Sequence, residues 1–187
     1  MVNQAKPTIA MFGGSFDPPH IGHQQIVENA IEKLEIDTLI IVPAYLNPFK
    51  TSSLADAPIR LDWCHRLFDT MPNVIVDDYE IKEGKSTVTS QSVKHFNQRY
   101  HVKYLIIGAD NLSTLTQWHA FEWLNETVTW LIATRDDHPL DTGALRKWEL
   151  LPIKSPISST QIREEKDLQY VDSKIQDSVR KILEGKS

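Results

Sequence analysis

Cysteine is almost absent from this chain, because Cys64 is the single cysteine among 187 residues. One cysteine excludes an internal disulfide and deprives a structural zinc site of its usual thiolate ligands. The sequence also lacks an apolar run near the ~20 residues that a helix needs to span a bilayer. Residues 1–7 have no apolar core of the kind found in export signals. We therefore expect a cytoplasmic protein with no membrane partner.

Positive charge is in the minority as well. Lys and Arg number 20 against 25 Asp and Glu, which gives a formal net charge of −5. Non-specific binding to nucleic acid relies on a basic face, so this balance argues against a nucleic-acid partner. An acidic protein that handles polyanions must gather its cations locally. The candidates for such a cluster are Lys50, Arg135, Arg163, His20 and His23.

Apolar runs alternate with amphipathic segments along the chain. Strands are expected at 8–12, 38–42, 74–76, 104–107 and 129–133, with a short edge strand at 150–153. Helices are expected around 26–34, from 56 onward, at 90–98 and at 173–183, while 80–86 is polar and turn-like. This alternation predicts an α/β fold: a doubly wound parallel sheet of five to six strands with helices on both faces, as one domain over 1–187. Ligands of such sheets bind beyond the carboxyl ends of the strands.

The first predicted strand leads into the run Phe-Gly-Gly-Ser-Phe-Asp-Pro-Pro-His-Ile-Gly-His at 12–23. Strand, glycine turn and helix make a geometry in which backbone N–H groups converge on a phosphate. His20 and His23 stand at the opening of that helix, where each can donate a hydrogen bond to an anionic oxygen. The spacing alone leaves open that both are ordinary surface histidines.

Two later segments follow predicted strands. The loop from Pro43 is stiffened by prolines and ends at Lys50, which can meet a phosphate as a point charge or be a plain surface lysine. Gly108 at a strand end allows a ligand to approach the backbone closely. Asp110 can accept from ribose hydroxyls or cap a helix, and Trp118 offers a stacking face or belongs to the core.

A third segment, Pro-Ile-Ser-Ser-Thr-Gln-Ile-Arg at 156–163, places hydroxyls at a predicted helix start. Ser158, Ser159 and Thr160 lie there together, with Arg163 one turn further on. A capping motif needs one hydroxyl. Several hydroxyls with an arginine indicate an anion held by backbone, hydroxyls and guanidinium together.

In combination these motifs resemble the HxGH nucleotidylyltransferases and, through Ile-Gly-Ala-Asp-Asn followed by Trp118, the bacterial nicotinate-nucleotide adenylyltransferases. The resemblance extends from residue 12 to 163. It implies a Rossmann-like domain that transfers AMP from ATP to nicotinate mononucleotide in NAD biosynthesis. The products would be nicotinate adenine dinucleotide and pyrophosphate, formed by direct in-line attack at the α-phosphate. It also implies Mg²⁺ as cofactor with ATP, and it assigns no metal-binding residue.

The resemblance assigns residue roles motif by motif. As ATP-binding residues it implies Gly13, Gly14, Ser15, Phe16, His20, His23, Gly108, Asp110, Ser158, Ser159, Thr160 and Arg163. Among these, His20, His23 and Arg163 would be catalytic. As mononucleotide-binding residues it implies Lys50, Thr89, Trp118 and His119. The chain departs from the family pattern at Phe49, where a histidine is usual, and at Thr87-Val88-Thr89, where Ser-Tyr-Thr is usual.

The expected partners are ATP and nicotinate mononucleotide, with the protein a monomer or small homo-oligomer. Two alternatives stay open. One is an adenylyltransferase that uses a related acceptor, either nicotinamide mononucleotide or phosphopantetheine. The other is a nucleotide-binding module that has no catalytic activity.

Overall fold

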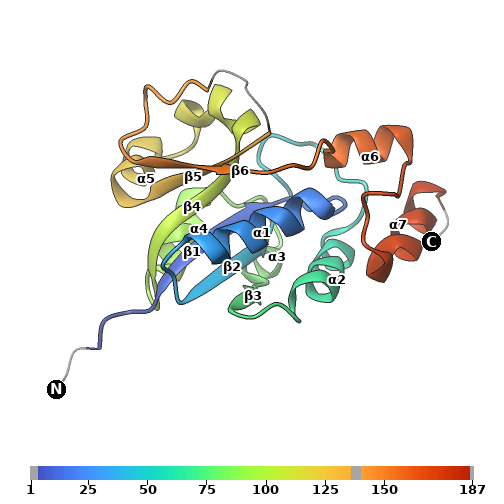
Figure 1. Ribbon diagram of the computed structural model, residues 1–187, viewed down its shortest axis with the longest axis horizontal. Coiled ribbons are helices and arrows are strands. Elements are labelled where there is room, and N and C mark those ends of the chain that lie inside the picture. The colour runs from blue at the N-terminus through green and yellow to red at the C-terminus, as the bar shows by residue number, and fades with distance from the viewer. Residues whose placement is uncertain (1–3, 136–139, 186–187) are drawn as a thin grey trace.

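The computed structural model describes residues 4–135 and 140–185, and its centre is a six-stranded parallel sheet. The strands are β1 (Thr8–Gly14), β2 (Thr38–Pro43), β3 (Val74–Val76), β4 (His101–Gly108), β5 (Thr129–Thr134) and β6 (Trp148–Pro152). Their order in the sheet is β3-β2-β1-β4-β5-β6, and each neighbouring pair is parallel (Figure 1). The predicted Rossmann-like, doubly wound α/β fold is confirmed.

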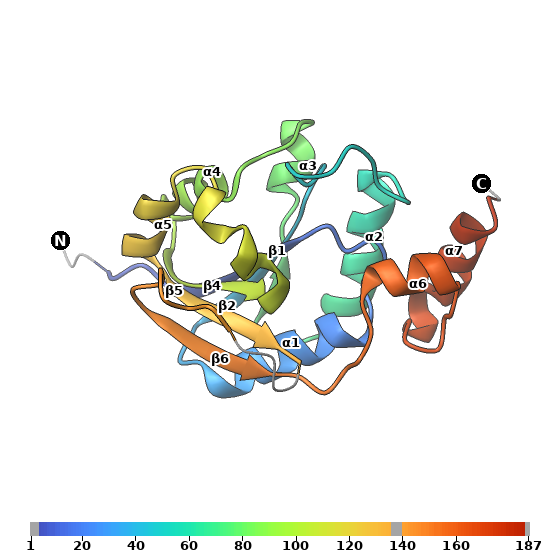
Figure 2. The same cartoon turned by 90° about the horizontal axis from the view of Figure 1, so that it is seen from above.

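Helices cover both faces of this sheet. One face carries α1 (Ile21–Lys33), α2 (Ala57–Phe68), α6 (Ser159–Glu165) and α7 (Ser173–Leu183). The other carries α3 (Tyr79–Glu83), α4 (Thr89–Phe96), α5 (Phe121–Thr127) and two 3₁₀ turns, η1 (Ala109–Ser113) and η2 (Leu115–Gln117). Figure 2 shows the sheet between α1 on one side and α4 and α5 on the other. No helix in the described part of the chain is both long and apolar enough to cross a membrane.

The apolar runs form strands because both faces of the sheet are covered. In β2, Leu39 and Ile41 join the cluster under α1 and α2, while Ile40 and Val42 join the cluster under α4 and α5. All four side chains are buried. Alternate residues of a strand point to opposite faces, so a strand buried on both faces needs a continuous apolar run.

One predicted element was wrong. Residues 80–86 were expected to form a turn, but α3 occupies Tyr79–Glu83 and ends at Gly84, whose φ is 64°. A helix this short gains little from its own sequence, so tertiary contacts must hold it. The contact is visible, because the Ser92 hydroxyl on α4 donates to the buried Glu80 carboxylate at 2.6 Å.

The strand order determines where on the sheet a ligand-binding crevice can form. The chain runs outward from β1 through β2 to β3 and then returns to β4, on the other side of β1. The loops that follow β1 and β4 therefore leave the sheet toward opposite faces. A crevice forms where such loops separate, beyond the carboxyl ends of the strands.

Candidate active site

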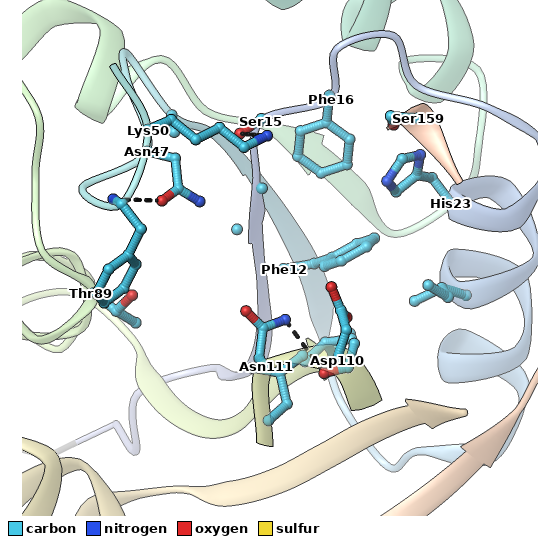
Figure 3. Close-up of a pocket in the computed structure, with 18 of the residues that line it drawn as sticks. Phe12, Ser15, Phe16, His23, Asn47, Lys50, Thr89, Asp110, Asn111 and Ser159 are labelled. Atoms are coloured by element: carbon cyan, nitrogen blue, oxygen red, sulfur yellow. Dashed lines mark hydrogen bonds between the residues drawn. The ribbon is translucent and has the colours of Figure 1, made fainter. Parts of the chain in front are cut away.

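A cavity of about 370 Å³ lies at this crevice. Every motif singled out in the sequence contributes to its lining. The lining includes Gly13, Gly14, Ser15, Phe16, His20, His23, Lys50, Thr89, Gly108, Asp110, Trp118, His119, Ser158, Ser159, Thr160 and Arg163. In Figure 3, Lys50 lies beside Ser15 along one side of the cavity and Asp110 lies on the opposite side, with Thr89 and His23 toward its two ends. The fold thus brings all the predicted site residues to one place.

The two histidines hold each other in position at the start of α1. The Nδ1 atom of His20 accepts from the backbone N–H of Gly22 at 3.0 Å, and that of His23 accepts from the N–H of His20 at 3.1 Å. An Nδ1 that accepts a hydrogen bond carries no proton, so each neutral ring has its proton on Nε2. His20 is 3% exposed, so the interpretation as surface histidines is wrong for it.

Both histidines are neutral at physiological pH. Burial, with a contribution from the charge of Arg135, lowers the pKa of His20 to about 3. Burial also lowers the pKa of His23 well below its usual range, aided by His20 and Arg135. The pair can therefore donate hydrogen bonds through Nε2 while adding no charge of its own to the cavity.

The first turn of α1 contributes no free backbone N–H group from Ile21, Gly22 or His23 to the predicted phosphate site. The N–H of Ile21 donates to the carbonyl of Tyr170 at 2.9 Å, and that of Gly22 donates to His20. The N–H of His23 donates to the carbonyl of His20 at 2.9 Å. The backbone N–H groups in the first turn of α1 thus donate to acceptors within the protein. The imidazole side chains of His20 and His23 remain as hydrogen-bond donors at the start of this helix.

Phe16 packs against His23 of the histidine pair. Its backbone is left-handed, with φ at 49°, and its ring is 2% exposed. That ring packs edge-on against Phe12 at 5.3 Å and lies 4.9 Å from the ring of His23. An unfavourable backbone conformation at a non-glycine residue persists where surrounding contacts enforce it. The side chain of Phe16 therefore acts on the cavity through His23.

The segment that opens α6 is tied directly to the loop after β1. Ser158 caps α6 by accepting from the N–H of Gln161 at 3.2 Å, and Ser159 donates its hydroxyl to the carbonyl of Pro18 at 2.8 Å. Arg163 donates to the carbonyl of Asp17 at 2.7 Å and to the Thr160 hydroxyl at 3.0 Å. These contacts hold a guanidinium and several hydroxyls against the loop that leads to the histidines.

Positive charge gathers in the cavity although the chain is acidic. Partial burial and the nearby charge of Arg163 lower the pKa of Lys50, and burial lowers the pKa of Arg135. The Nζ atom of Lys50 lies 3.5 Å from the Ser15 hydroxyl. The negative charge of Asp110 acts in the opposite direction and raises the pKa of both Lys50 and Arg135. Cations crowded in this way favour a bound polyanion.

The glycine at position 108, at the end of β4, is explained by the side chain of a close neighbour. A Cβ there would come within 2.5 Å of the Asp110 Oδ1 atom, so glycine allows that carboxylate to fold back over the end of β4. Asp110 does not cap a helix: it lies inside η1, and the N-cap residue that precedes η1 is Gly108, which provides no side-chain cap. The capping interpretation of Asp110 is therefore wrong.

Trp118 and His119 line the cavity, and His119 contacts the start of α4. The ring of Trp118 packs edge-on against buried Trp130, with centroids 6.3 Å apart. Its indole N–H is buried and has no hydrogen-bond partner among residues 4–135 and 140–185. The Nδ1 atom of His119 lies 3.1 Å from the Ser90 hydroxyl in the first turn of α4. That helix begins at Thr89 without a side-chain cap.

Comparison with known proteins decides the family. A family model described as cytidylyltransferase-like matches residues 11–165. A relative from Sulfurovum sp. (strain NBC37-1), named "Probable nicotinate-nucleotide adenylyltransferase", is 63% identical over 186 residues, which is 100% of this chain and 99% of the relative.

The chain belongs to the nicotinate-nucleotide adenylyltransferase family.

Other members of the nicotinate-nucleotide adenylyltransferase family agree. One from Campylobacter fetus subsp. fetus (strain 82-40) is 42% identical over 181 residues, or 96% of this chain and 98% of the relative. Among solved structures, the Plasmodium falciparum nicotinic acid mononucleotide adenylyltransferase complexed with NaAD has a TM-score of 0.73 and 20% identity, covering 96% of this chain and 95% of that one. At that identity the likeness supports the fold.

The two departures from the family pattern lie at the cavity. Phe49 is 64% exposed and lines the cavity. Val88 is the residue that precedes α4, and Thr87 beside it is buried. Both changes therefore fall where the acceptor is expected.

Two residues of the cavity wall, Arg135 and Glu80, were not among the predicted site residues. Arg135 was considered as a local cation but was not placed in the site, and it lies in the cavity wall. Glu80 was read as part of a turn, yet it is 6% exposed and lines the cavity, and burial raises its pKa to about 7. An apolar neighbourhood around an acidic residue is visible only in three dimensions.

Proposed function

We propose that this protein transfers AMP from ATP to nicotinate mononucleotide, giving nicotinate adenine dinucleotide and pyrophosphate. The observation that carries the proposal is the meeting of two residue sets in one cavity. In Figure 3, His23 and Ser159 lie toward one end of the cavity and Thr89 toward the other, with Lys50 reaching Ser15 between them. The other members of both sets, His20, Arg163, Trp118 and His119 among them, line the same cavity. Family membership over the full chain supports the same reaction.

ATP occupies the end between α1 and α6 in this proposal. The Nε2–H groups of His20 and His23 donate to oxygens of the α- and β-phosphates, and Arg163 faces them from the other side. The loop residues Gly13, Gly14, Ser15 and Phe16, the hydroxyls of Ser158, Ser159 and Thr160, and Gly108 with Asp110 complete the ATP site. The family motifs and the presence of all these residues in the cavity lining support these roles.

Nicotinate mononucleotide takes the other end. Trp118 provides a flat face for the pyridine ring, and Lys50 meets the mononucleotide phosphate. The N-terminus of α4 has no side-chain cap, and the Ser90–His119 contact brings the 118–119 segment to it. Helix N-termini favour carboxylates, so Thr89 and the backbone at His119 suit the nicotinate carboxylate.

The chemistry requires positioning and charge stabilisation. A non-bridging oxygen of the mononucleotide phosphate attacks the α-phosphorus of ATP in line, and the bond from that phosphorus to the β-bridging oxygen breaks. The electron pair of the broken bond leaves on pyrophosphate, where the imidazole N–H groups and Arg163 stabilise the growing charge. The attacking phosphate is already anionic, so the reaction needs no general base.

Nucleotidyltransferases that use ATP generally require a divalent metal, and we propose Mg²⁺ carried by the ATP phosphates. Residues 4–135 and 140–185 contain no cluster of three or more His, Cys, Asp or Glu side chains placed to hold a metal ion. In this proposal the substrate phosphates and water molecules are therefore the main ligands of the Mg²⁺, as is usual for this ion. Under the same proposal the protein acts in the cytoplasm as one domain over 1–187, as a monomer or small homo-oligomer.

Product identification tests the proposal. Purified protein with Mg-ATP and nicotinate mononucleotide should form nicotinate adenine dinucleotide and pyrophosphate in equal amounts, measured by mass spectrometry and a coupled pyrophosphate assay. ATP binding without any pyrophosphate, with nicotinate mononucleotide or the two alternative acceptors, would instead favour a non-catalytic nucleotide-binding module.

A further inference from the structure

Arg60 is a buried cation that does not line the cavity. It lies in the first turn of α2 and is 1% exposed. Its guanidinium donates only to backbone carbonyls among the described residues. These are Ala55 at 2.9 Å and Ser15, Ala44 and Tyr45, each at 2.7 Å. A lysine could not match this planar, multidentate arrangement.

The acceptors belong to two different loops of the cavity. Ser15 is in the loop after β1, which leads to the histidine pair. Ala44 and Tyr45 begin the loop after β2, which leads to Lys50. The backbone pairing of the two strands ends where the N–H of Ala44 donates to the carbonyl of Gly14 at 2.9 Å. Arg60 continues the connection past that point through its side chain.

Asp17 reinforces the connection from the other loop. It is 3% exposed, and its carboxylate accepts from the N–H groups of Leu54 at 2.7 Å and Ala55 at 3.0 Å. The far end of the loop after β2 is thereby tied to the loop after β1. The negative charge of Asp17 also acts on Arg60, raising its pKa against the effect of burial. A buried cation is tolerated when a charge and hydrogen bonds compensate it in this way.

We propose that Arg60 is a positioning residue that fixes the separation of the loops after β1 and β2, and so aligns the nicotinate mononucleotide phosphate with the α-phosphate of ATP. The inference rests on the proposed function, in which the first loop serves ATP and the second serves the mononucleotide. Each loop keeps its own strand when Arg60 is changed. Each substrate should therefore still bind, while the distance between the reacting atoms is no longer fixed. Misplacement by about 1 Å can lower a rate by about 10²-fold.

The test compares Arg60→Lys with Trp63→Phe. Trp63 lies on the same helix and is equally buried, but its indole N–H points to Ser178 of α7 at 2.9 Å, away from both loops. For Arg60→Lys we expect kcat to fall at least tenfold, while calorimetric Kd values for α,β-methylene-ATP and for nicotinate mononucleotide each stay within threefold. Trp63→Phe should lose thermal stability and keep kcat.

Unchanged kcat in Arg60→Lys, or an equal fall of kcat in Trp63→Phe, would overturn the role of Arg60. If Arg60→Lys does not fold, Asp17→Asn tests the same connection, because an amide can accept only one of the two backbone N–H bonds. Loss of kcat with both Kd values kept is again expected, and unchanged kcat again overturns the role. A wild-type protein that forms no nicotinate adenine dinucleotide would reject the proposed function itself, which distinguishes the two failures.

Discussion

Replacing Gly22 with alanine should separate catalysis from stability in this enzyme. Gly22 is buried in the first turn of α1, between the two histidines in sequence. A Cβ at this position would lie 2.8 Å from the His20 Cε1 atom and 3.0 Å from its Nδ1 atom. The Ser155 hydroxyl, at 3.3 Å, leaves the new methyl group little room on its other side. The imidazole of His20 must therefore shift to make room for the methyl group.

The stability terms of Gly22→Ala nearly cancel. Alanine in place of glycine favours a helix by up to ~1 kcal/mol. Disturbing the hydrogen bond from the Gly22 N–H to His20 removes a cap worth ~1 kcal/mol. The rate has no such compensation, because a displaced donor on the leaving pyrophosphate costs ~10²–10³-fold. We therefore expect kcat to fall about 10²-fold while the free energy of unfolding changes by less than ~1 kcal/mol.

The assay is initial-rate pyrophosphate release at saturating Mg-ATP and nicotinate mononucleotide, with urea denaturation of the same samples. Gly143→Ala is the matched control, since a Cβ there meets only Asp141 Oδ1 at 3.4 Å and the residue does not line the cavity. A Gly22→Ala variant that keeps kcat within threefold of wild type would refute the role given to His20. So would a loss of rate that appears only with a loss of several kcal/mol in stability.

Three further variants address other parts of the site. Trp118→Ala should raise the KM for nicotinate mononucleotide by a factor corresponding to ~1–3 kcal/mol and leave the KM for ATP unchanged, and an equal rise in both would indicate structural damage instead. Arg163→Lys should lower kcat/KM for ATP by ~10²-fold, because one ammonium cannot serve the Asp17 carbonyl, the Thr160 hydroxyl and a phosphate together, and a change below threefold would contradict this. Burial raises the pKa of Glu80 from 4.5 to about 7, so the folded state binds more protons than the unfolded state between these pH values and stability falls as pH rises through them. Glu80→Gln should therefore become more stable relative to wild type by up to ~3 kcal/mol between pH 4 and pH 8 in urea denaturation, and a pH-independent difference would disprove the effect.

Local sequence was sufficient for the sheet and for the gathering of the motifs. In a chain that alternates strands and helices, the continuous apolar run Leu39–Val42 indicates a strand buried on both faces. Because the strands are parallel, the segments that follow them meet at the same edge of the sheet. The predicted boundaries of α7, at 173 and 183, also agree with the structure, since its apolar spacing is strong and Gly185 follows it.

Long-range contacts explain what the sequence did not reveal. Arg60 and Arg66 lie on the same helix and look alike in sequence. Arg66 is exposed and pairs with Asp62 at 2.8 Å, whereas Arg60 is buried under the carbonyls of two loops. No periodicity distinguishes them, because the acceptors of Arg60 include Ser15, 45 positions away. The short helix α3 and the buried position of Glu80 likewise depend on a contact from another part of the chain, the hydrogen bond from Ser92.

A competition between acceptors tests the central claim most directly. Wild-type protein is given limiting Mg-ATP and an equimolar mixture of nicotinate mononucleotide, nicotinamide mononucleotide and phosphopantetheine, and the adenylylated products are counted by mass spectrometry. Product ratios in such a mixture report the ratio of kcat/KM values for the acceptors. We predict that nicotinate adenine dinucleotide dominates the products. A mixture dominated by either of the other adducts would contradict the assignment of this cavity.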